Sequence, residues 1–426
     1  MESPQFELGA DWAQKMDAQD ELAACRHEFL IHDPDVIYLD GCSLGRLPKR
    51  TEERLRRAVH DEWGGKVIGG WRGAGWAAGP RRIGDKLGRL LGAGPGQIVV
   101  TDSTSINLYK LTMAAVAMRP ERRKIVSDEF NFPTDLYVLQ GVVGQKGEGY
   151  SLHLVRSADG THLDTESLCS AIDEDTALFT ASVPSFKSCY LYDMATITRR
   201  AHEKGALVLW DLCHAAGVVP VELDEWGVDL AVGCSYKYLN GGPGGTAWLY
   251  VRKELQKAAL SPVQGWWSHR RPFLFDLDYA PADDISRYLA GTAPVLSLLP
   301  VEEGVDLTLE VGVERLRNKS VALTEYMIFL TDQILTPLGF GVGSPRSAAQ
   351  RGSHVRLLHD EAYRITEAMG KDMRTVVEFR PPNGIRVGLP PLYISFGEVW
   401  EAVQRFKQVV ENRLYEKYEP SAVAYT

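Results

Sequence analysis

The sequence has no run of about 18 consecutive apolar residues, the length that a membrane-spanning helix requires. It also has no basic stripe, because its 47 lysines and arginines are scattered among 56 acidic residues and leave a net charge of −9. A protein that binds nucleic acid usually gathers its basic residues on one surface. We therefore expect neither a membrane nor a nucleic acid as a partner. Residues 1–22 are acidic and lack the apolar segment of a signal peptide.

No C-x-x-C pair occurs among the six cysteines, and their spacing suits neither a zinc site nor a disulfide framework. We expect no bound metal and a reducing compartment, the cytoplasm. Internal repeats and low-complexity segments are also absent. The composition, with 45% hydrophobic and 24% charged residues over 426 positions, is that of a globular protein with a large core. Disordered and collagen-like classes are thereby excluded.

Short apolar runs alternate with amphipathic stretches of helical length through the middle of the chain. This alternation predicts an α/β fold with a mostly parallel sheet covered by helices on both faces. Ligands bind such sheets at the carboxyl ends of the strands, so the residues that follow each run are the candidates for a site. The runs that read as buried strands are residues 98–100, 124–126, 177–181, 206–210, 230–233 and 247–251.

The last hundred residues have a different character. Residues 302–339 carry one long helical pattern that ends at a glycine, and shorter strands and helices follow it. The strands are expected at 354–359, 375–380 and 384–389, and the helices at 361–370 and 396–417. We predict a large α/β domain that carries the ligand site over residues 56–305, a small α+β domain over 306–426, and an N-terminal segment, 1–55, that packs with the small domain.

Two segments in the middle of the chain place polar residues at strand ends. Asp211 directly follows the run 206–210, His214 comes three positions later, and Lys237 lies 26 residues after Asp211, before a glycine-rich loop. Taken singly, Asp211 reads as a turn cap, His214 as a buried histidine and Lys237 as a solvated loop residue. Together, Lys237 and Asp211 supply two groups that pyridoxal phosphate requires, an amine for an imine and a carboxylate for the pyridine nitrogen.

The cofactor also needs a phosphate pocket and a cover for its ring. Thr104 and Ser105 lie in a hydroxyl-rich turn before a helical pattern, where free backbone N–H groups bind anions, and Tyr236 can add a phenol. Phe132 can stack on the ring, and Asp135 can accept hydrogen bonds near the imine. Without a ligand, the same segments read as an ordinary helix cap and a proline-containing turn.

In their order along the chain, these segments resemble the kynureninases, in the class V aminotransferase branch of fold-type I pyridoxal-phosphate enzymes. The resemblance runs from residue 38 to residue 403 and rests on TDSTSINLYK, NFPTDLY, WDLCHAAG, CSYKYLNGGPGG, GWWSHRRPF and RYLAGTAPVLSLLPVEEGVDL. It implies an aspartate-aminotransferase-like fold whose large sheet is of the seven-stranded type. It also implies pyridoxal 5'-phosphate as cofactor and a homodimer with the active site at the subunit interface.

The resemblance gives roles to individual residues. Lys237 would carry the imine, Asp211 would pair with the pyridinium beside His214, and Tyr236 would act as an acid and base. The other cofactor contacts would be Thr104, Ser105, Phe132, Asp135, Trp266 and Thr292, the last two from the partner subunit. Arg386 would bind the substrate carboxylate, as its planar fork allows, although a strand arginine can equally pair with a surface acid. Ser43, Trp63, Cys42, His269 and Gly291 would lie at the substrate end. Trp71 and Trp76, close to Trp63 in the sequence, can equally fill the interface between domains, and His269 can be a solvated loop residue.

Several substrate-end positions depart from the usual family pattern. GCSLG stands for the common GNSLG, GTAP for GTPP, and VPSFKSC replaces the asparagine, tyrosine, arginine and glycine of a familiar segment by Ser185, Phe186, Lys187 and Cys189. We expect a hydrolase that cleaves the Cβ–Cγ bond of kynurenine or a ring-substituted kynurenine to an anthranilate and L-alanine. A lyase or aldol-type transferase acting on another amino acid remains the alternative. The intact lysine, aspartate and arginine argue against a non-catalytic binding protein.

Overall fold

The computed structural model describes residues 6–157 and 163–420, and its largest element is a seven-stranded sheet. All strands run parallel except β8, which is antiparallel to both of its neighbours. The order across the sheet is β2 (Ile98–Val100), β8 (Trp248–Val251), β7 (Leu230–Gly233), β6 (Leu207–Asp211), β5 (Thr176–Ser182), β3 (Lys124–Asp128) and β4 (Ser151–Val155). The predicted fold class is confirmed, and all six predicted runs are strands of this sheet.

Strand β4 is the one strand of the large sheet that the sequence analysis missed. Its first four residues alternate between exposed and half-buried and only Val155 is buried, so it lacks the continuous apolar run by which the other six were found. It pairs in parallel with β3 at the edge of the sheet. An edge strand needs less apolar surface than a central one, which accounts for its weak pattern.

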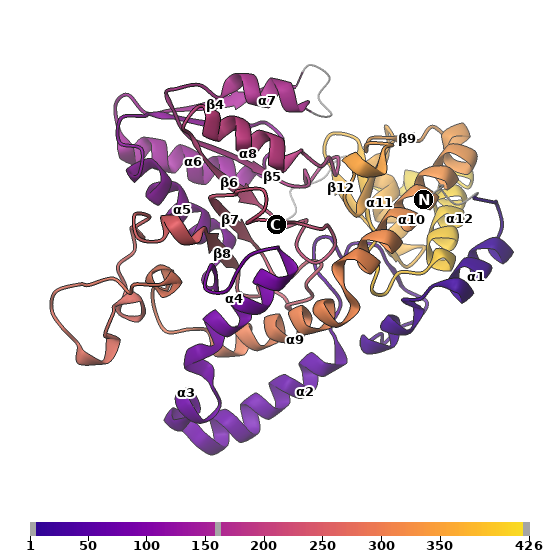
Figure 1. Cartoon of the computed structure of the whole chain (residues 1–426). Helices are drawn as coiled ribbons and strands as arrows, with labels where there is room; N and C mark the ends of the chain where they lie inside the picture. Colours follow the sequence, from indigo (N-terminus) through magenta and orange to yellow (C-terminus); the bar gives the residue numbers. More distant parts are fainter. Residues whose placement is uncertain (1–5, 158–162, 421–426) are drawn as a thin grey trace.

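Side chains of each central strand alternate between two hydrophobic cores. In β6, Val208 and Trp210 belong to one core, and Leu207 and Leu209 belong to the other. Helices therefore cover both faces of the sheet (Figure 1). The face with Leu207 carries α5 (Thr104–Ala117) and α6 (Pro133–Lys146), whereas the face with Trp210 carries α4 (Gly79–Leu90), α7 (Thr165–Ala171) and α8 (Met194–Glu203).

A second, antiparallel sheet lies beside the first with its own hydrophobic core. Its strand order is β12 (Glu378–Arg380), β13 (Gly384–Gly388), β10 (His354–Leu358) and β9 (Gly341–Val342). Helices α10 (Val313–Leu330), α11 (Ala362–Lys371) and α12 (Phe396–Glu411) pack on it, and the predicted helix over 396–417 thus ends at Glu411 before a separate short turn, Leu414–Lys417.

The N-terminal segment contacts this second core. Helix α1 (Ala10–Gln19) packs against α12, and β1 (Ile37–Tyr38) pairs in parallel with β11 (Thr375–Val376). Trp12 and Phe29 contribute buried rings to the same core. The exact domain limits at residues 55 and 305 remain a prediction.

The single helical pattern expected over residues 302–339 is wrong, because the chain forms two helices there. Helix α9 (Val295–Val311) ends at Gly312, whose φ of 90° is a left-handed conformation that favours glycine, and α10 begins at the next residue. The start of α9 packs on the large core, and its end, with Leu307 and Val311, packs on the small one. The break therefore allows the chain to pass from one core to the other.

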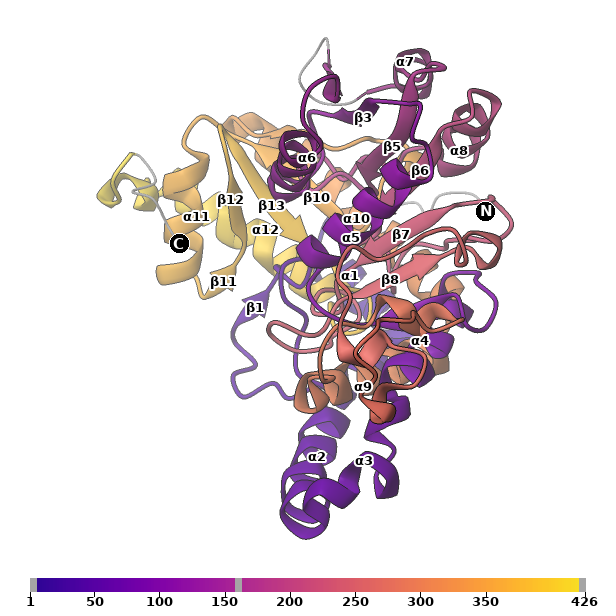
Figure 2. The ribbon, with the colours of Figure 1, turned by 90° about the vertical axis from the view of Figure 1, so that its left-hand side faces the viewer.

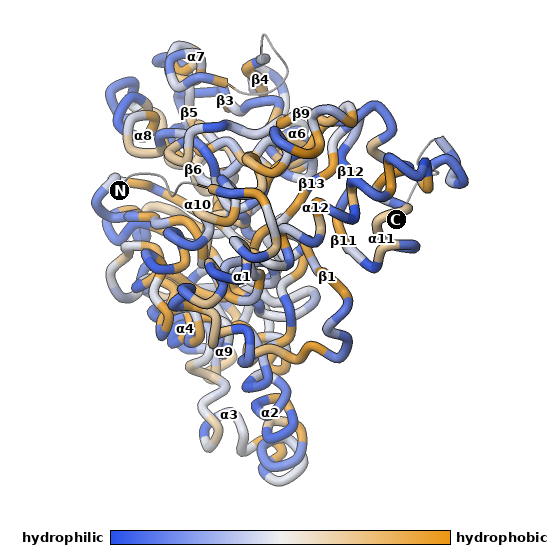
Figure 3. The backbone as a smooth tube through the Cα atoms, turned by 90° about the vertical axis from the view of Figure 1, so that its right-hand side faces the viewer, coloured by the Kyte–Doolittle hydropathy of each residue, from blue (hydrophilic) through white to orange (hydrophobic). Residues whose placement is uncertain are grey.

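An arm formed by α2 (Lys49–Arg57) and α3 (Gly70–Gly73) extends away from both sheets (Figure 2). Figure 3 shows α2 as a mostly hydrophilic segment. Within the arm, Glu62 pairs with Arg54 at 2.9 Å and accepts a hydrogen bond from Trp76 Nε1 at 2.8 Å. These contacts stabilise a segment that has little core of its own.

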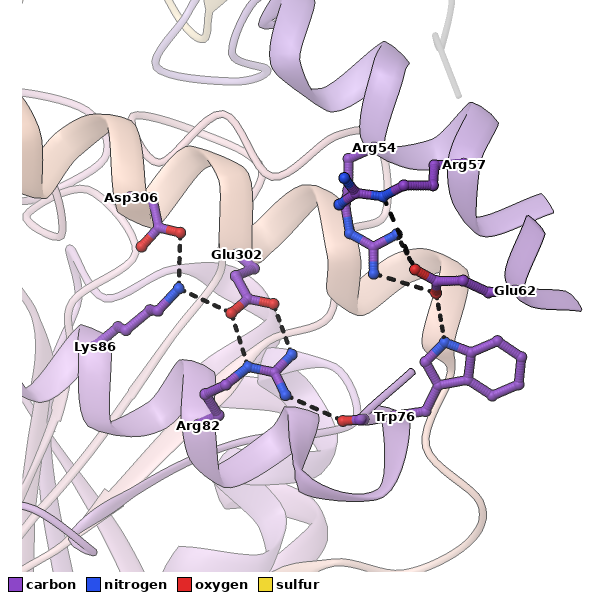
Figure 4. Close-up of polar contacts among 9 residues, drawn as sticks. Arg54, Arg57, Glu62, Trp76, Arg82, Lys86, Glu302 and Asp306 are labelled. Atoms are coloured by element: carbon purple, nitrogen blue, oxygen red, sulfur yellow. Dashed lines mark hydrogen bonds and ion pairs between the residues drawn. The ribbon is translucent and has the colours of Figure 1, made fainter. Parts of the chain in front are cut away.

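Ion pairs join α4, at the base of the arm, to α9 (Figure 4). Arg82 binds Glu302 through two hydrogen bonds of 2.9 and 2.8 Å, and Lys86 contacts Glu302 at 2.8 Å and Asp306 at 2.7 Å. Burial opposes the charge of Glu302, but the bonds to Arg82 and Lys86 outweigh it and lower the pKa of Glu302 to about 2. Two-point arginine pairing of this kind fixes helix orientation better than a single contact.

Among the described residues, no helix is long and apolar enough to cross a membrane.

Candidate active site

A cavity of about 320 Å³ lies at the carboxyl edge of the large sheet, between that sheet and the small one. It brings together ten of the sixteen residues that the sequence analysis selected. These ten are Ser43, Thr104, Ser105, Phe132, Asp135, Asp211, His214, Tyr236, Lys237 and Arg386. The cavity also has three lining residues that were missed, Thr134, Cys213 and Arg380. Thr134 and Cys213 adjoin selected residues in the chain, whereas Arg380 could be found only from the pairing of the small sheet.

Lys237 and His214 meet in this cavity because they follow neighbouring parallel strands, β7 and β6. Lys237 Nζ lies 3.1 Å from His214 Nε2 and 6.0 Å from the centre of the Phe132 ring. Burial lowers the pKa of His214 well below its usual value, and the charge of Lys237 lowers it further. His214 is therefore neutral and can accept a hydrogen bond from the lysine.

Two buried carboxyl groups form the floor of the cavity. Asp211 ends β6, and Asp135 lies in the first turn of α6. Ser182 Oγ lies 3.2 Å from an oxygen of Asp211 and 3.4 Å from one of Asp135, and the backbone N–H of Cys213 donates to Asp211 at 2.8 Å. Burial and the charge of Asp211 raise the pKa of Asp135 well above its usual value. The raised pKa favours the protonated form of Asp135 beside Asp211.

The N-terminus of α5 forms another wall. Ser103 is the N-cap residue, and its Oγ accepts from the backbone N–H of Ile106 at 3.4 Å, so Thr104 and Ser105 are the first two residues of the helix. The first N–H groups of a helix have no partner within it, and they carry the positive end of its dipole. An anion of the size of phosphate fits the chemistry of this wall.

The opposite wall comes from the small sheet and the N-terminal segment. Arg386 in β13 has only 2% of its side chain exposed, forms an ion pair with Glu378 and donates a hydrogen bond to Ser43 Oγ. Glu378 also binds Arg380 at 2.8 Å, and Asp40 lies 3.6 Å from Arg386. The sequence analysis selected neither Glu378, Arg380 nor Asp40. The only signal of Glu378 and Arg380 was alternation along the short strand β12, which becomes informative once that strand is paired with β13. Asp40 lies in the N-terminal segment, and only the packing of that segment on the small sheet brings it to Arg386.

Six selected residues do not line the cavity within one chain. Cys42 is buried behind it, with Sγ 3.6 Å from an Asp40 oxygen, and burial raises the pKa of its thiol to about 12, so it is not a reactive thiolate. Trp63 lines a separate apolar groove with Trp76 and Leu296. Trp266 and His269 line a third depression, and Gly291 and Thr292 are exposed. Within a single chain, Cys42, Trp63, His269 and Gly291 therefore do not line the cavity at the positions predicted for them.

Comparison with known proteins places the whole chain in one family. A model of the kynureninase C-terminal domain matches residues 316–406. The kynureninase of Pseudomonas fluorescens is 42% identical over 404 residues, which are 94% of this chain and 95% of that protein. A kynureninase of Burkholderia pseudomallei strain 1106a is 39% identical over 408 residues, which are 95% of this chain and 96% of that protein.

Solved structures of more distant proteins share the fold. A cysteine desulfurase from Thermococcus onnurineus NA1 matches 89% of this chain and 95% of its own, with a TM-score of 0.76 at 19% identity. A cysteine desulfurase from Escherichia coli matches 92% of this chain and 99% of its own, with a TM-score of 0.78 at 16% identity. These distant likenesses support the fold alone. On the strength of its identity to curated relatives over nearly its full length, the chain belongs to the kynureninase family.

Proposed function

We propose that this protein is a pyridoxal-phosphate-dependent hydrolase that cleaves the Cβ–Cγ bond of kynurenine, or of a ring-substituted kynurenine, to an anthranilate and L-alanine. The observation that carries the proposal is that Lys237, Asp211 and Arg386 line one cavity. The two relatives at 42% and 39% identity are named kynureninase. Water supplies the atoms that balance this reaction, an OH for the acyl carbon and a hydrogen for the carbon that becomes the methyl group of alanine.

The residues present fit the cofactor. Asp211 and Asp135 place two buried carboxyl groups at one end of the cavity, and a buried carboxylate suits a protonated ring nitrogen as its partner. Phe132 would cover the ring, and Thr104 with Ser105 would hold the phosphate. When bound, pyridoxal phosphate supplies an electron sink for bond breaking at the amino acid's Cα and Cβ. Lys237 would attach it.

The remaining chemistry belongs to the side chains of this chain. The amine of Lys237 removes the proton from the substrate's Cα, and neutral His214 keeps that amine in place by accepting its hydrogen bond. The neighbouring Cys234 and burial raise the pKa of Tyr236, so its phenol keeps its proton and can donate it to Cβ. Arg386 orients the amino acid through its carboxylate.

A product assay tests this function. The protein loaded with cofactor is incubated with kynurenine, 3-hydroxykynurenine and methylated analogues, and the products are identified by mass. We expect equal amounts of the matching anthranilate and of alanine, and the ratio of rates ranks the ring preferences. Absence of both products from all the substrates would contradict the proposal.

A homodimer in the cytoplasm is part of the same proposal. Trp266 and Thr292 lie outside the cavity of their own chain, and the nearby loop exposes Phe273, Phe275 and Leu277 by 67, 76 and 101%. Apolar surface of this kind usually marks a protein interface. Light scattering should give twice the chain mass of 47.3 kDa. A monomeric mass would mean that no partner subunit brings Trp266 and Thr292 to the site. The cysteines of the described residues are all free, which suits a reducing compartment.

A further inference from the structure

Glu378 connects the two arginines that line the small-sheet wall of the cavity. It stands directly opposite Arg386 in the antiparallel pair β12–β13 and two residues before Arg380 on its own strand. Cross-strand partners and residues two apart share one face of a sheet, so the three side chains point to the same side. One oxygen of Glu378 binds Arg380 Nη2 at 2.8 Å. The other contacts Arg386 and accepts from Ser43 Oγ at 2.8 Å.

The two arginines line the cavity, and Glu378 does not. Arg386 gives Nη2 to Glu378 and Ser43, while within residues 6–157 and 163–420 its Nη1 makes only a long contact of 3.4 Å to the carbonyl of Phe186. The Nε atoms of Arg386 and Arg380 are buried, and neither has a hydrogen-bond partner among the described residues. Both guanidinium groups therefore keep donors that Glu378 does not use, and a planar carboxylate is the ligand that matches such donors.

The positive charges of this wall are partly balanced before any ligand binds. Burial opposes the charge of Glu378, but Arg386 and Arg380 outweigh it and hold the pKa of Glu378 below its usual value. Glu378 is thus ionised and neutralises part of the charge of two guanidinium groups that stand close together. Without it, two like charges in a mostly buried place would repel, and each would be free to turn away.

We propose that Glu378 is a positioning residue for recognition of the substrate carboxylate, and that Arg380 is a second guanidinium at this subsite. Glu378 holds Arg386 and Arg380 side by side, so that their unused donors converge on one carboxylate group. The inference rests on the proposed function, because it needs an amino-acid substrate whose carboxylate enters this end of the cavity.

The test compares Glu378→Gln and Glu378→Asp with the wild-type holoenzyme, using kynurenine and the amine that remains when kynurenine loses its α-carboxylate. For Glu378→Gln we expect KM for kynurenine to rise about tenfold, with kcat within about threefold of wild type, because the loss is in ground-state binding. The inhibition constant of the decarboxylated amine should stay within about twofold, since that ligand has no carboxylate to place. Glu378→Asp keeps the charge and should recover part of the loss in KM.

Glu401→Gln is the matched control, because Glu401 binds Arg405 at 2.9 Å on α12 and does not line the cavity. It should leave both ligands unaffected. Equal weakening of both ligands by Glu378→Gln would overturn the proposal, as would tighter binding of kynurenine, which would make Glu378 a competitor of the substrate. If Glu378→Gln does not fold, Glu378→Asp alone tests the proposal. It should raise KM for kynurenine and leave the inhibition constant of the amine unchanged. If the wild type cleaves kynurenine and neither variant changes KM, this inference is wrong and the proposed function still holds.

Discussion

The two ends of the cavity are built in opposite ways. At the large-sheet end, Asp211 ends β6, Lys237 follows the adjacent parallel strand β7, and the two lie 26 positions apart in the chain. At the small-sheet end, Ser43 and Glu378 are hydrogen-bonded although 335 positions separate them. The first arrangement follows from the order of strands in a single sheet. The second needs the N-terminal segment and the C-terminal strands to pack together, so it depends on the whole fold.

The two ends also balance charge differently. The large-sheet end holds a neutral histidine and two buried carboxyl groups, Asp211 and Asp135, so it is prepared to receive a cationic ring. The small-sheet end pairs Arg386 and Arg380 with Glu378, so it is prepared to receive an anion. The comparison suggests that substitutions at the first end change kcat, while substitutions at the second change KM.

Replacement of Lys237 by alanine should give the largest effect and test the first half of this division. The variant loses the group that would attach the cofactor and move the Cα proton, so kcat should fall by at least about 1,000-fold. Visible absorbance of the loaded protein should disappear as well. Measurable turnover with retained absorbance would assign the chemistry to another residue.

Replacement of Asp211 by asparagine should lower kcat by about 100-fold, since a shift of about two pKa units on the ring nitrogen changes its protonated fraction by that factor. Asp135→Asn is the control, because the raised pKa of Asp135 favours its neutral form, and it should change kcat only about threefold. Steady-state kinetics give kcat for both variants and show which of the two carboxyl groups the reaction depends on more. An inverted order would exchange the roles of the two carboxyl groups.

Replacement of Arg386 by lysine tests the small-sheet end. A lysine keeps the charge but lacks the planar fork, so KM for kynurenine should rise about 30-fold while kcat changes much less. Initial rates over a range of substrate concentrations measure both constants. A fall in kcat of the same size without a change in KM would remove the distinction between the two ends.

The pH dependence of KM should give the smallest effect. Burial and the nearby Glu378 raise the pKa of Asp40 to about 6, so Asp40 gains a proton as the pH falls through that value. Protonation removes one negative charge that competes for Arg386, and KM should therefore fall by about threefold between pH 7.5 and 5.5. Asp40→Asn should have a low KM that is flat over this range. The same slope in Asp40→Asn would assign the titration to another group.

The large-sheet end could be predicted from sequence because its signals are local. A buried strand shows as an apolar run, and the polar residue after it lies at the sheet edge, which was enough to select Asp211, His214 and Lys237. The sequence could not show that Asp135 and Asp211 lie together, because the structure brings them within 3.4 and 3.2 Å of one hydroxyl, that of Ser182.

The small-sheet end was only partly predictable. Arg386 was selected from its strand, but Glu378 and Asp40 became visible only with the register of β12 on β13 and the docking of the N-terminal segment. Gly312 was inside a continuous helical pattern, and nothing local showed that the chain must turn there between two cores. Contacts across hundreds of residues leave no periodic pattern in a single sequence.

Cleavage of kynurenine in water enriched in ¹⁸O tests the central claim most directly, because a hydrolase must place an oxygen of the solvent in its acid product. We predict anthranilate with heavy oxygen in its carboxylate, and alanine in equal amount with no label gained in the step. Cleavage that leaves the acid product unlabelled, or no cleavage by protein that holds its cofactor, would contradict the account.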